Sequence, residues 1–168
     1  PSRGLGDVYK RQVYALRPFS DEERVTRAYL LGGEADAIIS IADATCPARS
    51  LYLTLQLLEL GVPVLGICYG CQLMAWMLGG KVETAPVSEY GKIKLTVLGG
   101  SVLRDVPQDS TVWMSHTDYI AQPPAGFTVT GKTADCPCAA MENPARGLYA
   151  VQFHPEVTHT TYGKEMLH

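Results

Sequence analysis

In the first half of the chain, short apolar runs alternate with longer stretches in which apolar residues recur at helical spacing. The strand-like runs are residues 13–16, 37–41 and 62–67, and the helix-like stretches are residues 21–31, 51–60 and 70–78. Ser20 supplies an N-cap before three acidic residues, and a glycine follows each of the three helical stretches. Strands that alternate with helices in this way predict a parallel α/β sheet.

The second half of the chain contains short strand-like segments separated by glycine, proline, asparagine and aspartate. These segments are residues 82–84, 93–98, 111–114, 127–132, 138–141 and 148–153. Such segments flank or extend a parallel sheet as further strands. The predicted fold class is therefore α/β: a doubly wound, mostly parallel, flavodoxin-like sheet flanked by helices, with additional antiparallel strands.

Composition narrows the class of protein. The chain has 168 residues, which suit one domain, and its 46% hydrophobic and 18% charged residues are typical of a soluble globular protein. Its net charge of −3 and the lack of a lysine or arginine run predict no general attraction to nucleic acid or to a membrane surface. The apolar stretches are too short to span a membrane. Five cysteines without framework spacing favour a reducing, cytoplasmic location.

The two ends of the chain differ from the rest. Residues 1–12 have no apolar core and no small-residue cleavage site, so they do not form a signal peptide and instead resemble a translated adaptor. The last six residues have the pattern of a helix that has just begun. We therefore expect a non-native tail over residues 1–12 and a domain over 13–168 that is truncated at both ends.

The strongest local motif is Gly66-Ile67-Cys68-Tyr69-Gly70, between a predicted buried strand and a predicted helix. It is the cysteine version of the G-x-S-x-G elbow, in which the glycines make room for a sharp turn. The turn presents the sulfur of Cys68 at a helix N-terminus, where the helix dipole favours the nucleophilic thiolate. Two other interpretations are a buried structural cysteine and a redox pair with Cys71, but the glycine pattern favours the nucleophile.

A nucleophilic cysteine needs a base and a group that orients the base. His154 and Glu156 supply both at the end of a predicted strand, and residues two apart in an extended segment point the same way. Glu156 can then fix the imidazole tautomer of His154 and stabilise the imidazolium.

Two metal-binding interpretations are weaker. His154, Glu156 and His159 do not have the spacing of a helical zinc motif, and Pro155 interrupts any helix there. The cysteines in Cys136-Pro137-Cys138 lack a second ligand pair at a useful spacing. We therefore expect no metal in this domain.

Two stretches, GVPVLGICYGCQLMAWMLGG and YAVQFHPEV, resemble the class I (triad) glutamine amidotransferases. Within that family, WMSHTD at 113–118, EYGK at 89–92 and HPEVTHTTYGKEML at 154–167 are similar to the glutaminase domain of GMP synthases. The resemblance is strong over residues 60–167 and weak over 13–50.

This resemblance implies hydrolysis of glutamine to glutamate and ammonia by Cys68, His154 and Glu156. It also implies that Tyr69 donates a backbone N–H to the oxyanion, and that Gln72, Ser115 and His116 line the glutamine pocket. The implied partner is an ATP-pyrophosphatase (synthetase) domain or subunit that uses ATP and Mg²⁺ and converts XMP to GMP with the ammonia. No cofactor is expected in the glutaminase domain itself.

The chain departs from the family after the strand at 37–41. The family has a Ser-Gly-Gly-Pro loop there, whose backbone supplies the second oxyanion donor, whereas this chain has Ser40-Ile41-Ala42-Asp43. A β-branched residue such as Ile41 adopts positive φ poorly, so a donor from Ile41 or Ala42 is doubtful. Real divergence and a local reading-frame error both explain the change. The alternatives to an active enzyme of this kind are a catalytically impaired regulatory or binding module and a γ-glutamyl hydrolase of the same fold.

Overall fold

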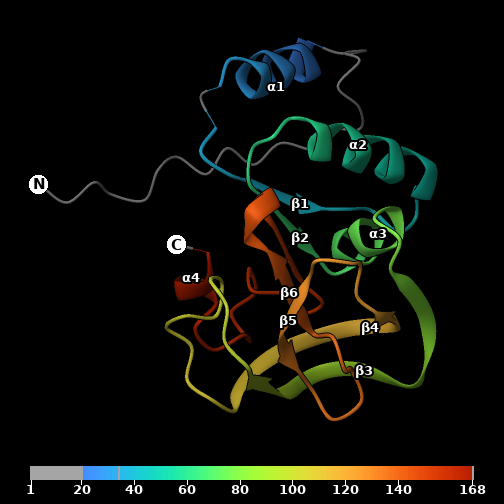
Figure 1. Cartoon of the computed structure of the whole chain (residues 1–168), viewed down its shortest axis with the longest axis vertical. Helices are drawn as coiled ribbons and strands as arrows, with labels where there is room; N and C mark the ends of the chain where they lie inside the picture. The colour runs from blue at the N-terminus through green and yellow to red at the C-terminus, as the bar shows by residue number, and fades with distance from the viewer. Residues whose placement is uncertain (1–20, 34, 168) are drawn as a thin grey trace, which may run out of the picture.

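The computed structural model describes residues 21–33 and 35–167, so the predicted tail at 1–12, the strand at 13–16 and the Ser20 cap lie outside the described residues. In chain order the elements are α1 (Asp21–Leu31), β1 (Ile38–Ile41), α2 (Pro47–Glu59), β2 (Val64–Ile67), α3 (Tyr69–Met77), β3 (Lys81–Val97), β4 (Ser110–Gln122), β5 (Thr128–Lys132), β6 (Ala140–Asn143), the 3-10 helix η1 (Pro144–Arg146), β7 (Leu148–Val151) and α4 (Gly163–Met166) (Figure 1).

The described strands form one sheet in the order β1-β2-β7-β6-β5-β3-β4. Strands β1, β2 and β7 run parallel, whereas β6, β5, β3 and β4 each pair antiparallel with their neighbours. The predicted α/β class with added antiparallel strands is confirmed. The antiparallel part is larger than expected, and it curls away from the helices (Figure 1).

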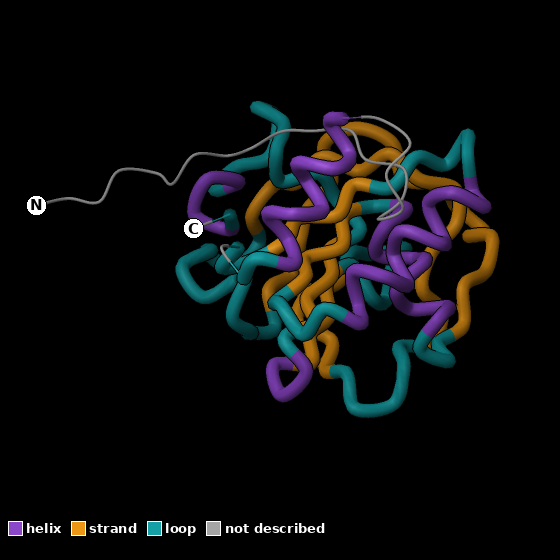
Figure 2. Tube along the Cα trace, turned by 90° about the horizontal axis from the view of Figure 1, so that it is seen from above, coloured by secondary structure: helices purple, strands orange, loops and turns teal. Residues whose placement is uncertain are grey.

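The helices cover the parallel part of the sheet. Helix α3 packs against β1, β2 and β7, and α2 packs against α3. Proline at position 47 suits the first turn of α2, because its missing N–H would have no helical partner there. Figure 2 shows the helices lying over the strands when the molecule is seen from above.

Strand β3 differs from the prediction. The sequence predicts two segments at 82–84 and 93–98, but the structure has one strand over Lys81–Val97 that pairs with β4. The register shifts between Thr84 and Glu89, so a bulge absorbs the residues around Pro86, which lacks a backbone donor. The hairpin therefore continues through a stretch whose composition resembles a turn.

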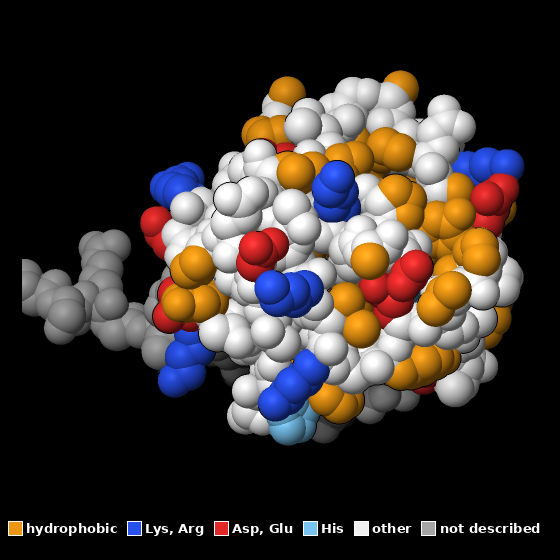
Figure 3. Space-filling model, turned by 90° about the horizontal axis from the view of Figure 1, so that it is seen from below, with side chains coloured by type: hydrophobic (Ala, Val, Ile, Leu, Met, Phe, Trp, Pro, Cys, Tyr) orange, Lys and Arg blue, Asp and Glu red, His pale blue; other side chains and the backbone are white. Residues whose placement is uncertain are grey.

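The core consists of two clusters of buried apolar side chains. One lies under the antiparallel strands and includes Ile67, Leu95, Met114 and Phe153, and the other lies between α3 and the sheet. On the face seen from below, hydrophobic side chains are interspersed with lysine, arginine and acidic side chains (Figure 3). Among the described helices, none combines the length and the apolar character that a membrane span requires.

Candidate active site

The backbone turns sharply at Cys68, between the end of β2 and the start of α3. Cys68 has φ 52° and ψ −111°, a conformation that non-glycine residues rarely adopt and that costs about 1–3 kcal/mol. Its N–H donates to the carbonyl oxygen of Val151 at 2.9 Å, which continues the β2–β7 pairing into the turn. The fold therefore holds the thiol-bearing residue in a strained elbow, as the sequence motif predicts.

The two glycines of the motif are required by close approach. A Cβ at Gly66 would lie 3.0 Å from the carbonyl carbon and oxygen of Gly70, across the turn. A Cβ at Gly70 would lie 2.6 Å from the carbonyl oxygen of Ser40, at the end of β1. Side chains at either position would force the elbow open.

His154 follows β7 on the polypeptide and lies beside the elbow. Its N–H donates to the carbonyl oxygen of Trp113 at 3.0 Å, and its Nδ1 lies 2.8 Å from Oε1 of Glu156. Hydrogen bonding to Cys68 and to Glu156 raises the pKa of His154 to about 10, against an opposing effect of burial. The structure therefore brings together the three residues that the sequence predicts as a triad.

Thr160, in the tail after the triad, supports His154 from behind. Its Oγ1 donates to the carbonyl oxygen of His154 at 2.5 Å and accepts from the N–H of Trp113 at 3.0 Å. Thr160 is buried, and the next residue, Thr161, donates its N–H to Thr111 on β4 at 2.9 Å. The ring of His159 packs on the ring of Trp113, with centroids 4.7 Å apart. The tail thus ties the base to β4.

The predicted glutamine-pocket residues occupy different places. The carbonyl oxygen of Ser115 lies 3.7 Å from Sγ of Cys68, so Ser115 is at the nucleophile. Gln72 is buried on α3 and donates to the carbonyl oxygen of Asp118 at 2.6 Å. Tyr69 is the first residue of α3, next to the nucleophile. Their roles toward a substrate stay predictions.

The side chain of His116 is buried and faces away from Cys68. Its Nε2 lies 3.2 Å from Oε2 of Glu89, while Oε1 of Glu89 accepts from the hydroxyl of Thr133 at 2.6 Å. Burial, followed by the charge of Glu89, raises the pKa of Cys136 to about 12. Glu89, His116 and Cys136 offer donor atoms within 4.8 Å of one another, so this set could hold a metal ion. The carboxylate oxygens of Glu89 and Nε2 of His116 already have protein partners, whereas Nδ1 of His116 has none among the described residues.

The doubtful oxyanion segment lies at the outer edge of the sheet. Ile41 is 53% exposed at the end of β1, which pairs only with β2 among the described strands. Asp43 turns the chain toward α2, and its N–H donates to Oγ of Ser50 at 3.1 Å. The backbone N of Ala42 lies 3.6 Å from the Cβ position of Gly70. The segment therefore passes close to the elbow, but a second oxyanion donor at Ile41 or Ala42 stays a prediction.

One residue next to the nucleophile has no predicted role in the sequence. Nε2 of Gln152, a fully buried side chain, lies 3.9 Å from Sγ of Cys68. Gln152 stands two residues before His154 in the same extended segment, so the period-two rule used for Glu156 could have identified it.

The fold and the triad geometry define a class of protein, and comparison with known families agrees with it. The family model described as Glutamine amidotransferase class-I matches residues 45–168, and the chain belongs to this family. The curated relatives that it matches include GMP synthase [glutamine-hydrolyzing] of Alkaliphilus metalliredigens, 62% identical over 113 residues, and that of Clostridium perfringens, 58% identical over 113 residues. Each alignment covers 67% of this chain and 22% of the relative, so the chain spans about a fifth of their length.

Solved structures give the same fold. A crystal structure of a GMP synthase component from Thermoplasma acidophilum is similar, with a TM-score of 0.75 and 31% identity. That alignment covers 80% of this chain and 70% of the other. A glutamine amidotransferase of Thermotoga maritima has a TM-score of 0.65 at 21% identity, covering 74% and 57% of the two chains, which supports the fold alone.

A second family model matches the N-terminal part of the chain. It is described as Ferrous iron transport protein B and matches residues 12–74, less than half of the chain. The amidotransferase match begins at residue 45, after the segment 40–43 that lacks the Ser-Gly-Gly-Pro loop. The departure from the family's loop therefore lies where only the second model matches.

Proposed function

We propose that this chain hydrolyses glutamine to glutamate and ammonia, with Cys68 as nucleophile and His154 and Glu156 as base and orienting group. The observation that carries the proposal is the strained elbow, which presents Cys68 beside a histidine that is paired with a carboxylate. An activated cysteine of this kind attacks amide carbonyls, because its thiolate is the reactive form.

In the proposed reaction, the Cys68 thiolate adds to the side-chain amide carbon of glutamine, and the carbonyl oxygen becomes an oxyanion. The N–H of Tyr69, at the start of α3, stabilises that oxyanion. His154 then protonates the departing nitrogen, and ammonia leaves as the γ-glutamyl thioester forms. Water, deprotonated by His154, cleaves the thioester and regenerates Cys68.

We further propose that the ammonia passes to an ATP-pyrophosphatase (synthetase) domain or subunit, which converts XMP to GMP with ATP and Mg²⁺. The support is the GMP synthase description of several relatives that are 55–64% identical to this chain. The same relatives argue against a γ-glutamyl hydrolase. A cytoplasmic location is part of this proposal, and the five cysteines, all free, are compatible with it.

A second candidate is a catalytically impaired module of the same fold. It is favoured by the segment 40–43, which has an exposed Ile41 where the family has glycine. Loss of one oxyanion donor lowers turnover by about 10²–10³, so the triad would still react with glutamine slowly.

A glutamine-mimicking electrophile tests the nucleophile. We expect a covalent adduct on Cys68, located by tandem mass spectrometry, and no adduct at that position in Cys68→Ala. The same variant, combined with a GMP synthetase partner, should lose glutamine-dependent GMP formation but keep ammonia-dependent formation. Absence of the adduct, with and without the partner and its nucleotide, would exclude the active glutaminase. An adduct without turnover would support the impaired module.

A further inference from the structure

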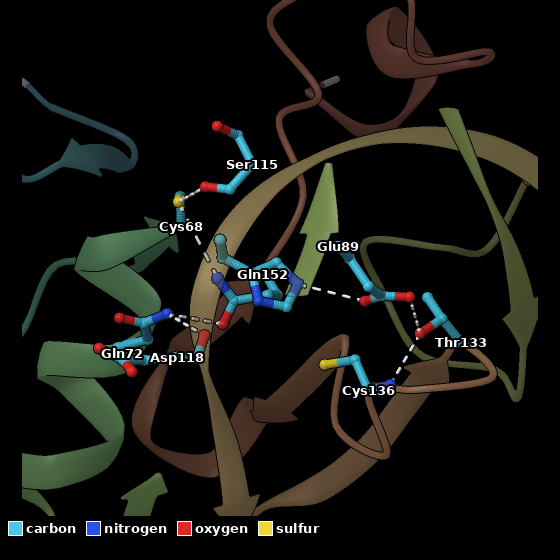
Figure 4. A network of polar contacts seen from close by, with 9 residues as sticks. Cys68, Gln72, Glu89, Ser115, Asp118, Thr133, Cys136 and Gln152 are labelled. Carbon is cyan, nitrogen blue, oxygen red and sulfur yellow. Dashed lines mark hydrogen bonds and ion pairs between the residues drawn. The ribbon is translucent and has the colours of Figure 1, made fainter. Parts of the chain in front are cut away.

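A row of side-chain amides leads from β4 to the nucleophile (Figure 4). Nε2 of Gln72 donates to the carbonyl oxygen of Asp118 at 2.6 Å and to Oε1 of Gln152 at 3.2 Å. Nε2 of Gln152 lies 3.9 Å from Sγ of Cys68. Gln72 is 7% exposed and Gln152 is fully buried, so water does not compete for these contacts.

The orientation of both amides follows from one backbone atom. A carbonyl oxygen only accepts hydrogen bonds, so the short contact with Asp118 requires the NH₂ group of Gln72 at that position. The same NH₂ group then faces Gln152, which must present its oxygen. The NH₂ group of Gln152 is left to point toward Cys68, and flipping either amide would bring two oxygens or two NH₂ groups together.

The sulfur of Cys68 therefore lies between an acceptor and a donor. The carbonyl oxygen of Ser115, 3.7 Å away, accepts the S–H of the neutral thiol and repels a thiolate. The NH₂ group of Gln152 donates to the sulfur, and a donor bonds more strongly to a charged acceptor than to a neutral one. Of these two contacts, the one with Gln152 strengthens when the thiol loses its proton.

We infer that Gln152 is a further catalytic residue, whose amide N–H stabilises the Cys68 thiolate, and that Gln72 is a positioning residue that sets the direction of that amide. The inference rests on the proposed role of Cys68 as nucleophile. It assigns to Gln72 a function inside the protein, through Gln152, in addition to any contact with glutamine.

The test is the pH profile of alkylation of Cys68 by iodoacetamide, which requires neither glutamine turnover nor a partner. Tandem mass spectrometry resolves Cys68 from the buried Cys71 on the same peptide. In Gln152→Met, which keeps the side-chain length but has no donor, we expect the midpoint to move up by roughly 0.5–1 pH unit. Below the midpoint, alkylation should slow by about 3- to 10-fold, because the thiolate fraction falls tenfold per pH unit.

Two further variants separate the donor from a packing effect. Gln72→Met removes the group that orients Gln152, so a smaller shift in the same direction is expected. Gln122→Met makes the same chemical change at an exposed position at the end of β4 and should leave the midpoint unchanged. If Gln152→Met does not fold, Gln152→Glu keeps the bond to Gln72 but replaces the donor by an acceptor, and the same upward shift is expected.

The outcomes are distinct. An unchanged midpoint in a folded Gln152 variant overturns the inference and leaves the nucleophile proposal standing. A parent chain in which Cys68 is not alkylated at any pH overturns the nucleophile proposal itself. An upward shift in the Gln152 variants, with none in Gln122→Met, supports the donor role.

Discussion

Replacing Thr160 by valine removes one oxygen atom that ties the base to β4. Valine has the shape of threonine, so packing is kept while two hydrogen bonds are lost: the bond to the carbonyl oxygen of His154 and the bond from the N–H of Trp113. Thr160 is 7% exposed, so water replaces these bonds poorly. At about 1 kcal/mol per bond, with a further cost for polar groups left unpaired, the free energy of unfolding should fall by about 2–4 kcal/mol.

The same change should slow the chemistry more than it weakens substrate binding. The lost oxygen holds the backbone of His154, and a displacement of about 1 Å in a reacting group can cost about 10² in rate. We therefore expect kcat for glutamine hydrolysis, or the rate of Cys68 labelling by the glutamine mimic, to fall by about one to two orders of magnitude while the variant stays folded.

Thr161→Val is the matched control, because Thr161 is exposed and its contact with Thr111 is made by the backbone N–H. Urea unfolding gives the free energy, and single-turnover labelling of Cys68 gives the rate. If Thr160→Val and Thr161→Val behave alike in both measurements, the tail does not position His154, and the argument from these two hydrogen bonds is wrong.

Three further predictions follow from the site. Gly70→Ala places a Cβ 2.6 Å from the carbonyl oxygen of Ser40, and such overpacking typically costs about 1–3 kcal/mol, which urea unfolding will measure; a variant as stable as the parent would show that the elbow is not tightly packed. Glu156→Gln keeps the shape of the orienting group but removes its charge, so turnover should fall by about 10²–10⁴ and the pKa of His154, measured by NMR titration, should move down from about 10; an unchanged titration would refute the pairing. Because folding raises the pKa of His154 from its usual 6.5 to about 10, this residue stabilises the fold fully below pH 6.5 and loses that contribution as the pH rises through 10. The stability difference between the parent and His154→Asn should therefore shrink over that range, and a difference that grows with pH would contradict the assignment.

Much of the parallel half of the molecule follows from the sequence. The strand at 37–41, the helix over 51–60 and the elbow at Cys68 depend on local spacing and on glycine, and the structure confirms them with small shifts of the boundaries. The antiparallel half is less predictable, because β3 crosses a proline and a glycine within one strand. Its continuity depends on pairing with β4, which lies outside the range of local patterns.

The sequence by itself determined the nucleophile motif and the pairing of His154 with Glu156, because both depend on residues no more than two positions apart. Only the tertiary structure decided what surrounds the sulfur and which polar residues are buried. The contact between Cys68 and Gln152 spans 84 positions, and the contact between Cys68 and Ser115 spans 47. The same holds for His116, whose motif suggests a pocket residue but whose side chain is buried against Glu89. Contacts of this kind depend on which strands are neighbours and in what register, and that arrangement is set by packing across the whole sheet.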